Sequence, residues 1–119
     1  MHSDNIEVII YKILKYVYEC QRKGVTPQPD DIRHNSELLG IPESYWVDIM
    51  HIIEKEQFLE GVTVLEIPDT DIHRVSMHRP LRITLKGSTF LEENSMMAKA
   101  KDFLGLSFET FLKSMLALL

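Results

Sequence analysis

A run of β-branched and aliphatic side chains at residues 62–67 constrains the fold of this sequence more than any other feature. Such residues favour an extended strand, and the run follows a segment with helical spacing of apolar residues. A second segment, residues 81–84, alternates apolar and polar side chains as a half-buried strand does. The two segments predict an antiparallel pair of strands around a polar loop, residues 68–79, which is longer than a tight turn.

Two helical segments are predicted near the N-terminus. Residues 4–22 carry apolar side chains at the spacing of an amphipathic helix, with Ser3 or Asp4 as the expected N-cap and Gly24 just past the end. Residues 29–34 begin with a proline and two acidic residues, which is typical of a short helix. Residues 25–26 between them are β-branched and suit a stub of edge strand. The predicted buried stripe of the first helix is Ile6, Ile9, Ile10, Ile13, Leu14, Val17 and Cys20.

A third helix is expected to start at Pro42 and to run to about Gln57, with Gly61 following its end. After the predicted hairpin, residues 84–101 indicate another helix, with Thr84 as its N-cap and Gly87 allowing a close approach to the sheet. Residues 107–119 form a last amphipathic segment. The buried stripe of the third helix is expected to be Trp46, Ile49, Met50 and Ile53.

Helices followed by a hairpin and further helices are the order of a winged helix-turn-helix domain. The sequence therefore predicts an α+β, mainly helical fold with a two- or three-stranded antiparallel wing sheet and extra C-terminal helices. We expect a winged-helix domain over residues 1–101 and an amphipathic C-terminal helix over residues 102–119.

Three segments, taken in order and spacing, resemble the YjcQ-like family of small winged-helix proteins from Gram-positive bacteria and their phages. The resemblance covers roughly residues 5–101, and it implies a winged-helix fold without catalytic residues. Relative to that family, the hydrophobic segment 103–119 is an addition. The segments are Leu39-Gly40-Ile41-Pro42-Glu43, then Ile53-Glu54-Lys55-Glu56-Gln57-Phe58-Leu59-Glu60-Gly61-Val62, and Ile83-Thr84-Leu85-Lys86-Gly87-Ser88-Thr89-Phe90-Leu91-Glu92-Glu93-Asn94.

One exposed stripe of the third helix is the candidate for reading DNA. In a helix-turn-helix protein, the second helix of the motif presents its side chains to the major groove. Residues 41–60 nevertheless hold five acids and one base, for which a solvated face is the simpler explanation. The stripe consists of Ser44, Asp48, His51 and Lys55.

Residues 72–86 supply the opposite charge, because they contain four bases and no acid. A basic wing tip suits the minor groove or the DNA backbone, although a mobile polar loop with accidental charge explains the same residues. The candidate DNA contacts in this segment are His73, Arg74, His78, Arg79 and Arg82.

The C-terminal segment has a broad apolar face that a monomer rarely leaves exposed. Either it pairs with a second copy in a two-fold dimer, which we favour, or it packs back on the first helix. The candidate dimer-interface residues are Leu104, Phe108, Phe111, Leu112 and Met115.

Several classes of function lack support in the sequence. The chain has no glycine-flanked serine and no Gly-rich phosphate loop, and its single cysteine, Cys20, falls on an apolar helix stripe. The histidines near residues 69–78 match no compact zinc spacing. We therefore expect no enzyme, no metal and no cofactor. No secretory signal or membrane-spanning run is visible, so we expect a cytoplasmic protein.

Two functions remain open. The first is a DNA-binding regulator that recognises double-stranded DNA. The second is a protein–protein interaction module on the same scaffold, which the net charge of −5 favours because DNA-binding proteins usually carry a basic surface.

Overall fold

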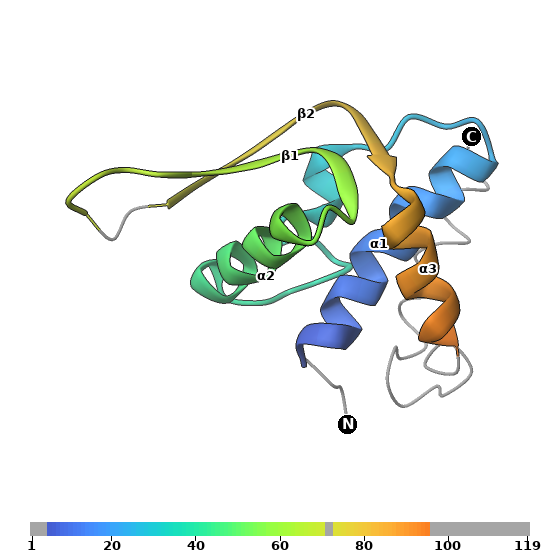
Figure 1. Ribbon diagram of the computed structural model, residues 1–119, viewed down its shortest axis with the longest axis horizontal. Helices are drawn as coiled ribbons and strands as arrows, with labels where there is room; N and C mark the ends of the chain where they lie inside the picture. Colours follow the sequence, from blue (N-terminus) through green and yellow to red (C-terminus); the bar gives the residue numbers. More distant parts are fainter. Residues whose placement is uncertain (1–4, 71–72, 96–119) are drawn as a thin grey trace.

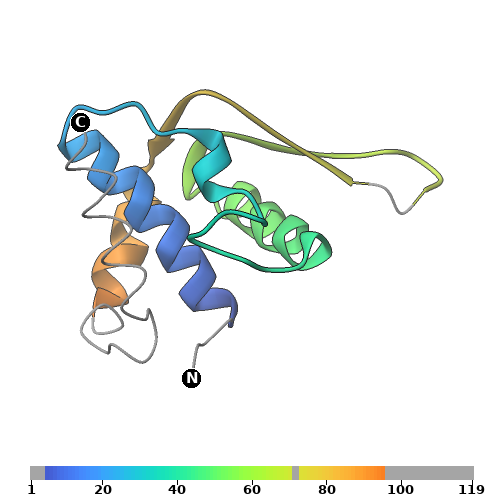
Figure 2. The ribbon, with the colours of Figure 1, turned by 180° about the vertical axis from the view of Figure 1, so that it is seen from behind.

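The computed structural model describes residues 5–70 and 73–95 (Figure 1). Three α-helices and an antiparallel ribbon form an α+β fold, and their order confirms the predicted winged-helix arrangement. In Figures 1 and 2, α1 lies between α2 and α3, and the ribbon extends past α2, away from α1 and α3. The elements are α1 (Ile6–Arg22), the 3-10 helix η1 (Pro29–Ile32), α2 (Glu43–Lys55), β1 (Leu59–Glu66), β2 (His73–Ile83) and α3 (Leu85–Glu93).

The first helix, α1, is the centre of the core. Its side chains are buried without a break from Val8 to Leu14, which covers nearly two turns and therefore more than one face of the helix. It packs against α2, α3 and β2. The predicted apolar stripe is confirmed except at Ile6, which is 40% exposed because it opens the first turn.

The ends of α1 differ slightly from expectation. The N-cap is Asn5, whose Oδ1 accepts a hydrogen bond from the backbone N–H of Val8 at 2.9 Å. At the C-terminus, Val25 N–H donates to the Cys20 carbonyl at 2.8 Å, and Gly24 N–H donates to Gln21 at 3.2 Å. These two bonds form a Schellman motif, which turns the chain away from the helix axis. Residues 25–26, considered as a strand stub, are therefore part of the helix termination and belong to no strand.

The ribbon is longer than the sequence predicted. β2 begins at His73, so that the connection between the strands covers only residues 67–72 instead of a dozen residues. Val75 and Met77 alternate with Arg74 and Ser76 in this part of β2, and the charged residues concealed the strand pattern. Within the described residues the sheet has two strands, with Leu59 opposite Ile83 and Glu66 opposite His73.

Gly61 does not end the third helix, as predicted, but lies inside β1 at φ +90°. The register is irregular at this point, between Glu60 and Val62. A Cβ atom at Gly61 would lie 2.5 Å from the carbonyl oxygen of His78 and 2.7 Å from that of Pro80. Only glycine fits here, because the facing strand comes so close.

The helix α2 ends at Lys55, where Gln57 makes the turn into β1. Gln57 has φ +60°, in the left-handed region, and its N–H donates to the Glu54 carbonyl at 3.0 Å. Phe58 N–H donates to Ile53 at 3.0 Å, which completes a second Schellman motif. Because glutamine has no preference for this conformation, no residue type in the sequence marks the end of the helix here.

The last connection joins β2 to α3 and confirms two predictions. Thr84 is the N-cap of α3, and its Oγ1 accepts from Gly87 N–H at 3.0 Å. Thr84 Oγ1 in turn donates to the Gln57 carbonyl at 2.5 Å, and Thr84 N–H donates to the Phe58 carbonyl at 3.1 Å. Gly87 is buried against the Phe58 carbonyl oxygen, in a space that a Cβ atom would overlap.

Replacing Gly87 with alanine should destabilise the fold by about 2–3 kcal/mol, because the added methyl would overlap Phe58 and lie 2.7 Å from Ile83 Cγ1. At a solvent-exposed position inside a helix, replacing glycine with alanine stabilises the helix by about 1 kcal/mol. Urea unfolding followed by circular dichroism measures the difference, with Ser88→Ala as the control. A Gly87→Ala protein as stable as the wild type would contradict the close packing.

Replacing Gln57 with glycine should stabilise the fold by about 0.5–1 kcal/mol, since glycine adopts a left-handed φ without strain. The matched control is Glu56→Gly. Glu56 has φ −81°, so glycine relieves nothing there and should destabilise by about 0.5–1 kcal/mol. Opposite shifts of the urea midpoint are expected, and shifts of the same sign would contradict the left-handed turn.

Candidate nucleic-acid interface

The exposed face of α2 carries the four predicted DNA-reading residues. Ser44, Asp48, His51 and Lys55 are all exposed, at a spacing of three or four residues. The opposite face packs into the core through side chains confirmed as buried, which are Trp46, Ile49, Met50 and Ile53. The spacing of residues in the sequence therefore predicted the buried and the exposed face of α2 correctly. The four polar side chains form one continuous stripe.

Two polar contacts, one buried and one partly buried, hold the segment before α2 in place. The indole Nε1 of Trp46 donates to the Ile32 carbonyl at 2.8 Å, which fixes α2 against η1. The Trp46 ring also packs against His34, with ring centroids 5.9 Å apart. These contacts set the angle at which α2 leaves the turn, and so the direction in which its exposed stripe points.

Tyr16 of α1 provides the second contact. Its hydroxyl donates to Asp31 Oδ2 at 2.6 Å and accepts from Gln28 N–H at 2.9 Å. Burial of the ring raises the pKa of Tyr16, and the hydrogen bond to Asp31 raises it further. The hydroxyl therefore keeps its proton well above the usual range of tyrosine and stays a donor to η1.

The exposed basic residues of the ribbon alternate with apolar ones along β2. Arg74, His78 and Arg82 are exposed, and so is Pro80, whereas Val75, Met77 and Leu81 are more buried. Alternate residues of a strand point to opposite faces, so the three bases lie on the outer face of the ribbon. The inner face packs against the core through Val64, Val75 and Met77. His73 and Arg79 belong to β2, but their side chains lie outside the described part.

Strand pairing changes the charge that the linear sequence indicated. Arg82 lies opposite Glu60 and His73 lies opposite Glu66, so β1 brings acids next to the bases of β2. The described part of the connection contains Asp69 and no base. The bases expected in a loop therefore lie along β2, because that strand starts six residues earlier than the end of the predicted loop. Their role as DNA contacts stays a prediction.

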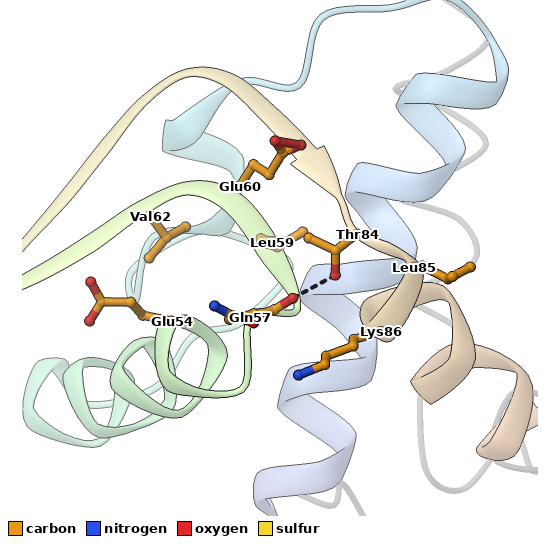
Figure 3. Close-up of a pocket in the computed structure, with 8 residues that line it drawn as sticks. All are labelled: Glu54, Gln57, Leu59, Glu60, Val62, Thr84, Leu85 and Lys86. Carbon is orange, nitrogen blue, oxygen red and sulfur yellow. Dashed lines mark hydrogen bonds between the residues drawn. The ribbon is translucent and has the colours of Figure 1, made fainter.

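A hollow at the base of the ribbon was not predicted. It lies between the last turn of α2, the start of β1 and the first turn of α3 (Figure 3), and has a volume of about 440 Å³. No sequence motif marks it, because its walls come from separate segments. It is lined by Glu54, Gln57, Leu59, Glu60, Val62, Thr84, Leu85 and Lys86.

The predicted dimer interface is not tested by these observations. The segment for which a C-terminal helix is predicted, residues 102–119, lies outside the described part of the chain. A dimer through this segment stays a prediction. The residues concerned are Leu104, Phe108, Phe111, Leu112 and Met115.

None of the helices in the described residues has an apolar stretch of the length that spans a bilayer. The helices, the exposed α2 stripe and the projecting ribbon define a winged-helix protein of the α+β class. The sequence profile of the YjcQ protein family matches residues 11–106, and the chain therefore belongs to the YjcQ family, which confirms the resemblance. No curated protein and no solved structure matches the chain.

Replacing Tyr16 with phenylalanine should cost about 1–3 kcal/mol, because Asp31 loses its donor and Gln28 N–H loses its acceptor. The raised pKa of Tyr16 adds a pH dependence. Protonated Tyr16 makes its full contribution to the free energy of unfolding below about pH 10, the tyrosine pKa of the unfolded chain. That contribution falls as the pH rises further. Unfolding midpoints at neutral pH and above pH 10 should show this fall in the wild type and a smaller one in Tyr16→Phe.

Tyr18→Phe is the matched control, since Tyr18 is a half-buried tyrosine of the same helix. It should stay within about 0.5 kcal/mol of the wild type. An equal loss in both variants would show that the Tyr16 hydroxyl has no special role in holding η1.

Proposed function

We propose that this YjcQ family protein binds double-stranded DNA through the exposed stripe of α2, as a non-enzymatic transcriptional regulator. The observation that supports the proposal is the stripe itself. Its polar side chains, Ser44, Asp48, His51 and Lys55, are exposed on the second helix of a helix-turn-helix, beside a projecting ribbon. This is the arrangement in which a helix enters the major groove.

The acidic charge around α2 does not fall evenly on this helix. Three of its five acids, Glu54, Glu56 and Glu60, lie at its C-terminal end or beyond it, whereas the N-terminal half of a recognition helix contacts the bases. Glu43 opens the first turn of α2. Asp48 is the acid inside the stripe. A carboxylate in that position accepts a hydrogen bond from the amino group of cytosine, so the stripe has a donor and an acceptor for base edges.

The ribbon supplies few phosphate contacts. Arg74 and Arg82 are exposed on its outer face, and Glu60 lies across from Arg82. Two or three neutralised phosphates give a slope of log K against log salt of about −2 to −3, shallower than for strongly basic DNA-binding proteins. Low ionic strength is therefore the condition in which binding is measured.

The test is fluorescence anisotropy with a labelled 30-base-pair random duplex pool at low salt, followed by enrichment of bound sequences. Lys55→Gln should weaken binding to the enriched duplex roughly tenfold, as expected for a lost DNA contact. Lys23→Gln removes another exposed lysine, next to the end of α1, and should change binding less than twofold.

A wild-type affinity weaker than about 100 μM at low salt, below ordinary nonspecific binding, would reject DNA as the partner. Equal losses in Lys55→Gln and Lys23→Gln would show that binding depends on total charge, without a role for α2.

A second candidate, a protein-interaction module, is favoured by the distal half of the ribbon. Leu65 and Ile67 are 51% and 41% exposed there, in an arm whose described connection is acidic. Exposed apolar side chains on a projecting arm suit a protein partner better than DNA. This candidate gains support from two results in cells. The Lys55→Gln protein should keep the function of the wild-type protein, and the double variant Leu65→Ser, Ile67→Ser should lose it.

A further inference from the structure

A groove lies between α1 and α3, which run beside each other in Figures 1 and 2. It has a volume of about 290 Å³ and is lined from α1 by Tyr11, Lys15 and Tyr18. Leu91 of α3 lines it from the facing helix, and Ser95 follows just after α3. Tyr11 and Leu91 are only 3% and 8% exposed, so they form the floor of the groove. The groove therefore offers an apolar contact surface beneath a polar rim.

The side of α1 beside this groove is buried as well. Val8 is fully buried, although it lies on the opposite side of the helix from Val17 of the core. η1 packs against α1 at Tyr16 and α3 lies at Tyr18. Since successive residues are about 100° apart, Val8 is about 80° from each of these positions around the helix axis. The complete burial of Val8 indicates a further cover on this side of α1, between η1 and α3.

The chain leaves the described part at the groove. Ser95 is the last described residue, and residues 96–119 follow it. Residues 103–119 carry apolar side chains at helical spacing, and as a helix they would extend about 25 Å, which is the length of the 17-residue helix α1. This segment is therefore long enough to cover both the groove and the side of Val8. The match to the family profile ends at residue 106, so it leaves out most of this segment.

We propose that residues 103–119 pack as a helix into the groove between α1 and α3 of the same chain. Phe108, Phe111 and Met115 lie on one side of this helix and cover the floor of the groove. The charged residues Glu109 and Lys113 lie on the opposite side and stay in solvent. The inference goes beyond DNA binding and does not depend on it.

A short connection favours the same chain over a second copy. Residues 96–102 join the groove to the segment, and this length is common for connections between packed helices. A linker of this length holds the segment at an effective concentration in the millimolar range, which exceeds the concentration of a second copy in dilute solution. Of the two arrangements expected from the sequence, packing on the first helix is therefore favoured. A two-fold dimer is an outcome that the test can show.

The first experiment is nuclear magnetic resonance of the ¹³C,¹⁵N-labelled full chain. We expect nuclear Overhauser effects between the methyl groups of Leu112 and the ring protons of Tyr11 or Tyr18. These effects should be absent from an isotope-filtered spectrum of labelled and unlabelled protein that were unfolded and refolded together. Contacts between two copies in the filtered spectrum, or no contact of residues 108–115 with the groove, would overturn the proposal.

Thermal unfolding of full-length variants is the second experiment. Phe108→Ser with Phe111→Ser should lower the unfolding midpoint by at least about 8 °C, because two large apolar side chains no longer pack in the groove. The matched control is Glu109→Ser with Lys113→Ser on the opposite side, which should lower it by less than about 3 °C. Equal shifts in the two double variants would overturn the proposal.

The dependence on protein concentration separates the two arrangements. The wild-type midpoint should stay constant over a roughly thirtyfold range of concentration, because the unfolding of a monomer does not depend on concentration. A midpoint that rises with concentration would assign the segment to a second copy and overturn packing within the chain.

Discussion

The contact between the start of α3 and the end of α2 fixes the rest of this fold. Thr84 donates to the Gln57 carbonyl and caps Gly87, and Gly87 lies against the Phe58 carbonyl. Both ends of the hairpin are thereby held at one point, which also ends the helix bearing the exposed stripe. The direction of the ribbon and the position of α2 consequently depend on this junction. It has no space for a methyl group at position 87 and requires the hydroxyl group of Thr84.

Local patterns in the sequence were enough to predict the helices and their buried faces. The stripe of Trp46, Ile49, Met50 and Ile53 follows from helical spacing alone, and so does the exposure of the stripe on the opposite side. Thr84 and Gly87 were predicted in their roles because capping and close packing depend on the residue type itself. The general order of a winged helix needed nothing further.

Long-range pairing determined what the sequence could not show. The acid-free segment 72–86 looked basic until β1 placed Glu60 opposite Arg82, which cross-strand register alone decides. Gln57 gave no helix-end signal, since side chains rarely adopt a left-handed turn and glutamine has no preference for it. The hollow was invisible for the same reason: Glu54, Val62 and Lys86 meet only after three elements have packed.

Within residues 5–70 and 73–95, no further strand pairs with either outer edge of the two-stranded ribbon, and unpaired strand edges invite aggregation. Proline removes a donor from β2 at position 80, and the strand is irregular nearby. If the β1 strands of two molecules paired antiparallel about Thr63, Glu60 of one molecule would lie opposite Glu66 of the other. The repulsion between these like charges disfavours such pairing. The glutamates that lie opposite the bases of β2 within one molecule thus also disfavour this edge-to-edge pairing between two molecules.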